Sequence, residues 1–150
     1  IADLKGKSVS IVSLQSAGGY ISQKDFLSQN GISVGIDMVI NEADGNKQEN
    51  VIFDVYSKKS DAGFIRESAL HRVDKVIEPE KIKVLVETSW LPNWVFTVHK
   101  SVSADVAVRI QEALLGLPAG GKVLKAAKLE GFVTPDPEAL NDVRKMVLEK

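Results

Sequence analysis

Residues 8–20 read SVSIVSLQSAGGY, a short apolar run followed by a glycine-rich break. The apolar residues predict a buried strand over residues 8–14, and the Gly18-Gly19 pair interrupts it before a helical stretch over residues 20–29. The fold therefore begins with a strand, a tight turn and a helix. The turn is called here the glycine turn and consists of residues 16–20, Ser16-Ala17-Gly18-Gly19-Tyr20.

Strand and helix patterns continue to alternate after this unit. Gly31 is placed to end the first helix, and Ile36-Asp37-Met38-Val39-Ile40 predicts a second strand. Apolar residues at helical spacing predict an amphipathic helix over residues 48–58, and a third strand follows over residues 62–65. This alternation predicts an α/β fold with a mainly parallel sheet flanked by helices.

The second half of the chain predicts further strands and three helices. Two strands are expected over residues 82–87 and 95–99. Ser103 is the expected cap of a helix that ends before Pro118 and Gly120-Gly121, and a shorter helix is expected over residues 122–129. Asp136 and Pro137 have the residue types that begin a last helix, and we expect that helix over residues 136–149.

Composition excludes several classes of protein. Nineteen basic and twenty acidic residues give a net charge of -1, without the basic excess of a nucleic-acid binder. The absence of cysteine excludes disulfides, thiolate metal sites and a cysteine nucleophile. No apolar run is long enough to cross a membrane. A chain of 150 residues suits a single compact domain, and we expect residues 1–150 to form one.

The glycine turn is the first candidate binding site. The start of a helix carries free backbone N–H groups and the positive end of the helix dipole, both of which favour an anion. Plain turn chemistry is the alternative. Arg66 follows the third predicted strand, and open parallel sheets bind ligands at the carboxyl ends of their strands, so we expect Arg66 near Ser16. The alternative for Arg66 is a surface ion pair with Glu67 or Asp61.

Two tryptophans stand around a rigid turn in Trp90-Leu91-Pro92-Asn93-Trp94. They are interpreted as the wall of a ligand pocket or as a domain hinge, with core packing as the alternative. His71 and His99 have no nearby carboxylate or cysteine arrangement that would indicate a metal site or a triad. The serines of residues 8–33 lack a base partner. We therefore expect no catalytic residue, no metal and no cofactor.

Four segments together resemble one family. They are Asp3-Leu4-Lys5-Gly6-Lys7, the glycine turn, Asp61-Ala62-Gly63-Phe64-Ile65-Arg66 and Leu91-Pro92-Asn93-Trp94-Val95-Phe96. In order and spacing the chain is similar to the second half of periplasmic solute-binding proteins of the phosphonate and phosphite type. The resemblance implies one lobe of a type II clamshell, the second of two, with the helix of residues 136–149 returning toward the missing first lobe.

The glycine turn departs from the pattern of the transporter members. Those members read Ser-Thr-Ser-Gly-Tyr here, whereas Ala17 and Gly18 replace two of the hydroxyl positions. Ser16 and backbone N–H groups remain as donors, which implies a small anion such as an oxyanion, a phosphonate or a sulfonate. Gln48 or Glu49 stands where the family has a histidine.

The context of Arg66 and Trp94 is most similar to versions of this fold that are fused to sensor histidine kinases. This resemblance implies an extracytoplasmic sensing domain of a membrane-anchored signalling protein. Its alternative is the substrate-binding component of an ABC transporter, which would work with a permease. The resemblance implies ligand-binding roles for Ser16, Ala17, Gly18, Gly19, Tyr20, Arg66, Trp90, Asn93 and Trp94.

Overall fold

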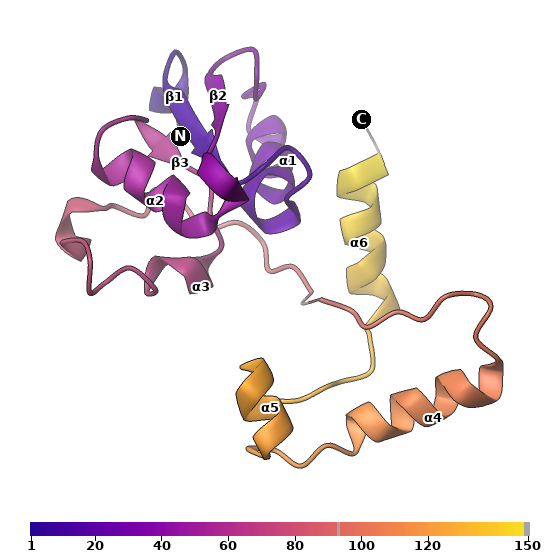
Figure 1. Cartoon of the computed structure of the whole chain (residues 1–150). Coiled ribbons are helices and arrows are strands. Elements are labelled where there is room, and N and C mark those ends of the chain that lie inside the picture. The colour runs from indigo at the N-terminus through magenta and orange to yellow at the C-terminus, as the bar shows by residue number, and fades with distance from the viewer. Residues whose placement is uncertain (93, 149–150) are drawn as a thin grey trace. The chain divides into compact units, whose positions relative to one another are not determined.

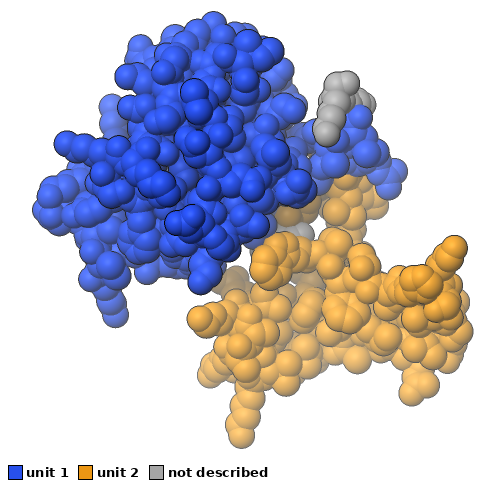
Figure 2. All heavy atoms as spheres, turned by 45° about the horizontal axis from the view of Figure 1, so that its top comes forward, with its two compact units in different colours: residues 1–91, 143–150 blue, residues 92–142 orange. Residues whose placement is uncertain are grey.

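The computed structural model describes residues 1–92 and 94–148 (Figure 1). They form two compact units. Unit 1 comprises residues 1–91 and the end of the chain from residue 143, and unit 2 comprises residues 92–142 (Figure 2). Each unit is described separately below.

Unit 1 contains a parallel sheet of three strands. These are β1 (Ser8–Ile11), β2 (Val39–Glu42) and β3 (Ala62–Gly63), in the order β2-β1-β3. Ser8 pairs with Val39 on one side of β1, and Val9 pairs with Ala62 on the other. Helices flank the sheet, which confirms the predicted α/β class. The second strand begins later than expected, at Val39, and β3 is shorter than the predicted 62–65.

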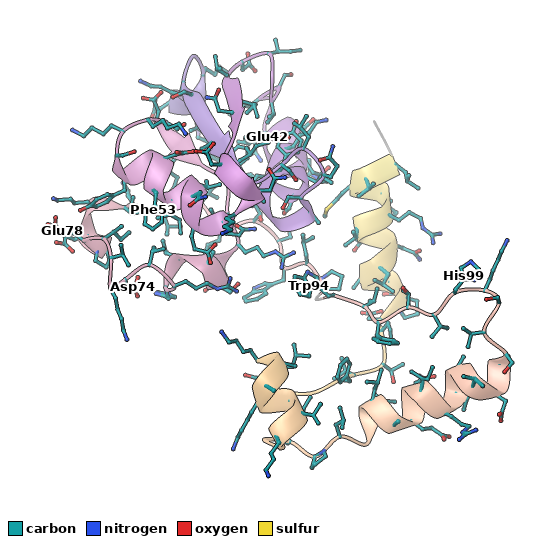
Figure 3. All side chains as sticks on the ribbon, in the orientation of Figure 1. Glu42, Phe53, Asp74, Glu78, Trp94 and His99 are labelled. Atoms are coloured by element: carbon teal, nitrogen blue, oxygen red, sulfur yellow. The ribbon has the colours of Figure 1, made fainter. Side chains whose placement is uncertain are left out.

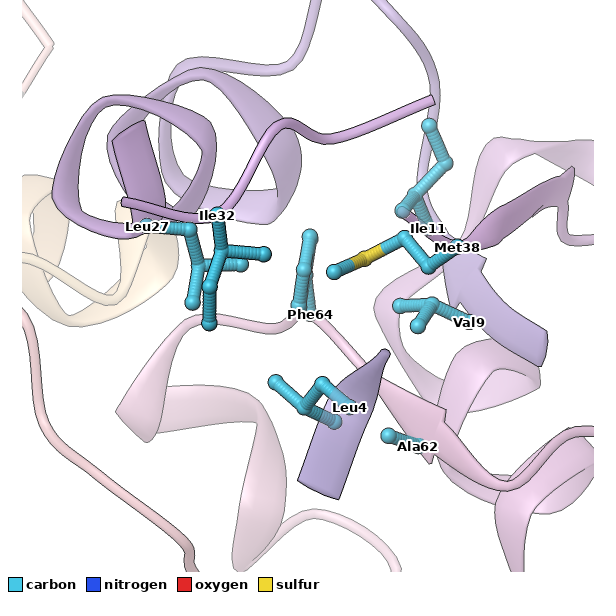
Figure 4. Packing of buried hydrophobic residues seen from close by; sticks show 8 residues of the cluster. All are labelled: Leu4, Val9, Ile11, Leu27, Ile32, Met38, Ala62 and Phe64. Carbon is cyan, nitrogen blue, oxygen red and sulfur yellow. The ribbon is translucent and has the colours of Figure 1, made fainter. Parts of the chain in front are cut away.

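Alternation along β1 directs its side chains to two different helices. Val9 and Ile11 are fully buried in one cluster with Leu27 of α1 (Ser22–Gln29) (Figure 4). Ser10 points the other way, where its hydroxyl donates a hydrogen bond of 2.7 Å to Asp54 of α2 (Gln48–Tyr56). The two helices therefore cover opposite faces of β1. The full membership of the first cluster is Leu4, Val9, Ile11, Leu27, Ile32, Met38, Ala62 and Phe64.

The end of α1 confirms the predicted role of Gly31. Gly31 has φ +73°, a left-handed conformation that glycine adopts without a steric penalty. The N–H of Gly31 donates to the carbonyl of Ser28 (3.1 Å), and the N–H of Ile32 donates to that of Leu27 (2.9 Å). These two bonds, together with the burial of Ile32 beside Leu27, form a Schellman motif.

Short helices complete the described part of unit 1. They are η1 (Ala2–Leu4), η2 (Ala17–Ile21), η3 (Asp44–Asn46), α3 (Glu67–Leu70) and η4 (Pro79–Lys81). A second buried cluster joins Ile52 of α2 to Ala69, Val73 and Ile77. This cluster holds α3 and the segment after it against α2.

The strands predicted over residues 82–87 and 95–99 are absent, so that prediction was wrong. A strand requires a partner to accept and donate its ladder hydrogen bonds. Neither segment pairs with the sheet of unit 1, whose three strands are β1, β2 and β3. Their apolar side chains are exposed instead, at Val84, Leu85, Val86, Val95, Phe96 and Val98.

Unit 2 contains α4 (Ala104–Leu115) and α5 (Lys122–Ala127), and α6 (Pro137–Leu148) begins in it. Ser103 caps α4 as predicted, since its hydroxyl accepts the N–H of Val106 at 3.5 Å. Asp136 caps α6 as predicted, accepting the N–H of Glu138 at 2.9 Å. Leu124 of α5 is the single buried hydrophobic residue among those described in this unit.

Candidate functional site

The glycine turn lies between the end of β1 and α1. Residues Ala17–Ile21 form a turn of π-helix, η2, which runs directly into α1. Its first intrahelical bond joins the N–H of Ile21 to the carbonyl of Ser16 at 3.0 Å. The N–H groups before Ile21 precede that bond and have no partner within the helix. The turn therefore presents backbone donors at the positive end of a helix.

Gly19 allows the turn to pack directly on the chain that follows β1. A Cβ atom at Gly19 would lie 2.6 Å from Cγ2 of Val12 and 2.9 Å from Oγ of Ser16. Both distances are shorter than real Cβ contacts. Glycine at this position therefore brings the Ser16 hydroxyl over the turn, whereas Tyr20 packs its side chain against the first buried cluster.

Gly18 leaves space for the side chain of Arg66. A Cβ atom at Gly18 would lie 2.8 Å from both Cγ and Nε of Arg66. The Arg66 side chain thus lies across the glycine turn, although the two residues are far apart in sequence. The side chain of Arg66 therefore lies directly above the backbone of Gly18.

Gln48 orients the backbone that carries Arg66. Its Oε1 accepts the N–H of Arg66 at 2.9 Å, and Gln48 is the first residue of α2. The residue after it is engaged elsewhere, since Glu49 pairs with Arg72 at 3.2 Å. A backbone hydrogen bond, opposed by burial and assisted by Arg72, lowers the pKa of Glu49. Gln48, rather than Glu49, therefore faces Arg66.

Gln23 joins the glycine turn to the segment after β3. Its side-chain Nε2 donates to the carbonyl of Gly18 and to the carbonyl of Ile65, both at 3.2 Å. This residue was not predicted from the sequence. Its only signal was a polar side chain in the first turn of α1, which Ser22 and Lys24 share.

Thr88 is a second residue that the sequence analysis missed. Its hydroxyl and that of Ser22, the first residue of α1, are 3.0 Å apart and hydrogen-bonded. Between residues 83 and 90, Thr88 alone is not exposed. The segment that leaves unit 1 is therefore attached beside the start of α1.

Acidic residues also lie near this edge of the sheet. Glu42 is the last residue of β2 (Figure 3), and its carboxylate accepts the N–H of Leu14, after β1, at 3.0 Å. Lys47 immediately precedes α2. The carboxyl ends of the three strands thus carry both signs of charge, with Arg66 as the cation that lies on the glycine turn.

The tryptophans are not packed in a core. Trp90 is 88% exposed in unit 1, and Trp94, which is labelled in Figure 3, is 85% exposed in unit 2. Neither side chain is buried among the described residues. Asn93 lies outside the described residues. The structure brings together the glycine turn, Arg66, Gln48 and Gln23, all within unit 1.

The described residues offer no group of three or more histidine, cysteine, aspartate or glutamate side chains that could hold a metal ion. His71 hydrogen-bonds Asp74 at 3.2 Å, and His99 hydrogen-bonds Ser101 at 2.9 Å. Among the helices described, none has the length and apolar character needed to span a membrane.

A parallel sheet whose carboxyl edge presents a helix start and an arginine is typical of α/β domains that hold a small ligand at that edge. The chain belongs to the family of periplasmic substrate-binding proteins of phosphonate ABC transporters, whose sequence model matches residues 1–140. No curated protein matches the chain.

This match confirms the family that was predicted from the sequence. The chain is therefore a solute-binding domain. Proteins of a substrate-binding family bind their solute without chemistry on it, so the domain is not an enzyme. The family is periplasmic, which places the domain outside the cytoplasm.

Proposed function

We propose that this domain binds a small anion at the glycine turn, with Arg66 as the counter-charge, and reports the bound solute to a signalling protein. The observation that carries the anion site is the side chain of Arg66 lying across Gly18, at the start of a helix. Backbone N–H groups, the Ser16 hydroxyl and the guanidinium are all donors that favour negative charge. Oxyanions, phosphonates and sulfonates share this chemistry.

The proposal includes a two-lobed clamshell to which the chain contributes the second lobe. Its support is the row of exposed apolar side chains in residues 84–98, which lack a partner strand in unit 1. In that arrangement Trp90 and Trp94 belong to the wall or hinge facing the ligand. Closure of the lobes around the anion would shift an equilibrium that a membrane-anchored module reads.

Removing the guanidinium tests the anion site. We expect Arg66→Ala to weaken binding by about tenfold to a hundredfold, the loss of one charge-assisted hydrogen bond. Backbone amide NMR titrations with inorganic phosphate, sulfate, methylphosphonate and methanesulfonate at constant ionic strength measure the affinities. Lys5→Ala is the control, since it removes an equal charge before β1, at the opposite end of the sheet. Equal affinity in Arg66→Ala and the unmodified chain would contradict the proposal.

Gly18 offers an independent variant for the same titrations. Gly18→Ala requires Arg66 to move, because the new Cβ atom would lie 2.8 Å from two of its atoms. We expect this variant to lose affinity as well. Gly131→Ala is the matched control, since a Cβ atom at Gly131 would meet nothing within 4 Å.

The second candidate function is the substrate-binding component of an ABC transporter. The family description favours it directly. The sequence of the complete gene separates the two functions. A kinase or other signalling module in the same protein supports sensing, whereas a lipoprotein signal with no signalling module supports transport.

A further inference from the structure

We propose that Gln23 is the positioning residue of the anion site, the side chain that fixes the glycine turn relative to Arg66. The inference rests on the proposed function and concerns how the same site is held together. Gln23 comes from α1, whereas its two acceptors belong to the glycine turn and to the segment after β3. It is therefore a bridge between the two backbone segments that form the site.

Both hydrogen bonds of Gln23 are accepted by residues that adjoin Arg66. One acceptor is the carbonyl of Gly18, the residue over which the Arg66 side chain lies. The other is the carbonyl of Ile65, the residue immediately before Arg66. A side chain with two N–H donors in a fixed planar geometry is needed to reach both. Gln23 thus sets the separation between the backbone donors of the turn and the base of the arginine.

The remaining atom of the amide, Oε1, has an unfavourable environment. Within the described residues, Oε1 of Gln23 is buried and no donor reaches it. An unpaired buried acceptor opposes folding, but an apolar side chain of similar length would leave the carbonyls of Gly18 and Ile65 without this donor. The favourable contribution of the amide therefore comes from its two N–H donors, and its oxygen opposes that contribution.

Gln48 complements Gln23 from the other side. Gln48 accepts the N–H of Arg66 and Gln23 donates to the carbonyl of Ile65, so both ends of the single peptide group between Ile65 and Arg66 are held by glutamine side chains. The first comes from α2 and the second from α1, the helices on opposite faces of β1. Arg66 is consequently oriented from both layers of unit 1.

Gln23→Met tests the inference on the complete chain. Methionine keeps the length and removes both donors, so we expect affinity for methylphosphonate to fall by about tenfold. The melting temperature should fall only modestly, because the carbonyls of Gly18 and Ile65 lose a donor while the unpaired oxygen is removed as well. Gln29→Met is the matched control, since Gln29 ends the same helix and donates from Nε2 to Asp25 at 2.7 Å, away from the site.

A pH profile separates positioning from structure. In Gln23→Glu, a carboxylate would face two carbonyl oxygens and repel them, whereas the protonated carboxyl can still donate one bond. The ratio of variant to unmodified affinity for methylphosphonate should therefore recover as the pH falls through about 8 to 5. Methylphosphonate itself also titrates, but it does so equally in both experiments, so the ratio of the two affinities does not contain that effect.

The outcomes distinguish this inference from the proposed function. If Arg66→Ala weakens binding while Gln23→Met binds as the unmodified chain does, the anion site stands and the positioning role is refuted. A flat ratio in Gln23→Glu refutes it too. If the unmodified chain and Arg66→Ala are indistinguishable with every probe, the proposed function fails and the inference fails with it.

Discussion

At the scale of single residues, Ser8, the first residue of β1, and Asp61, the residue before β3, are joined by several hydrogen bonds. Oδ2 of Asp61 accepts from the N–H of Ser8 at 2.9 Å and from its hydroxyl at 2.8 Å. The N–H of Asp61 donates back to the carbonyl of Ser8 at 3.0 Å. Both hydrogen bonds to Oδ2 lower the pKa of Asp61, and the one from the N–H of Ser8 has the larger effect. This contact aligns β3 with β1 and so helps to place Arg66 beside the glycine turn.

The lowered pKa of Asp61 makes the stability of unit 1 sensitive to acid. A carboxyl whose pKa is lower in the folded chain stabilises the fold above its unfolded pKa, and that contribution disappears as the pH falls through the folded pKa. Asp61→Asn should therefore lower the free energy of unfolding at neutral pH. The difference from the unmodified chain should shrink below about pH 4.

Urea denaturation followed by circular dichroism at several pH values measures this effect. Asp3→Asn is the control, because Asp3 is an exposed carboxylate on η1. A difference between Asp61→Asn and the unmodified chain that stays constant from neutral pH to pH values below about 4 would show that the Ser8 bonds do not depend on the charge.

At the scale of elements, the approach of α2 to β3 depends on Gly63. A Cβ atom at Gly63 would lie 2.6 Å from Cγ1 of Val51 and 3.0 Å from Cγ2 of Val55. Val51 is fully buried, so the helix has no free space into which to retreat. Gly63→Ala should therefore destabilise unit 1 by about 1–3 kcal/mol through overpacking.

A double-mutant cycle tests whether this contact is the cause. Val51→Ala removes the methyl group that the new Cβ atom would meet, so Gly63→Ala should destabilise the Val51→Ala background by less. Chemical denaturation of the four proteins gives the coupling energy. Additive effects, within about 0.5 kcal/mol, would assign the destabilisation to another cause.

The elements that could be predicted are those whose signal is local. The apolar residues of β1 and the apolar stripe of α2 have a period that a short window reveals. The caps of α4 and α6 were predictable because Ser103 and Asp136 act on residues two or three positions away. Residues 82–87 and 95–99 have the same apolar pattern as strands, but a strand forms only where a partner lies beside it, and the pattern contains no information about partners.

The candidate site shows the same division. The proximity of the glycine turn to Arg66 was predictable because each lies a few residues beyond the end of a strand, and the carboxyl ends of parallel strands meet at one edge. Gln23 and Thr88 were not, because their partners lie 42 and 66 residues away. Nothing in the sequence near Gln23 indicates where the carbonyl of Ile65 will be.

At the scale of the whole molecule, the buried residues are distributed very unevenly. All three buried clusters consist of residues between Leu4 and Ile77. Beyond Ile77, Leu124 is the one buried hydrophobic residue among those described. No residue of α6 is buried. Since cooperative unfolding reflects a shared core, residues 1–91 contain nearly all that is needed for it.

A chain that ends at Leu91 tests this distribution. We expect it to unfold in one cooperative thermal transition, with a midpoint within about 5 °C of that of the complete chain, because its three clusters remain intact. It should also keep the affinity of the complete chain for methylphosphonate, since the glycine turn, Gln23, Gln48 and Arg66 all lie in it. Calorimetry and an NMR titration measure the two properties. Loss of the transition would show that residues 92–150 stabilise unit 1, and a cooperative fold that no longer binds would place part of the anion site beyond Leu91.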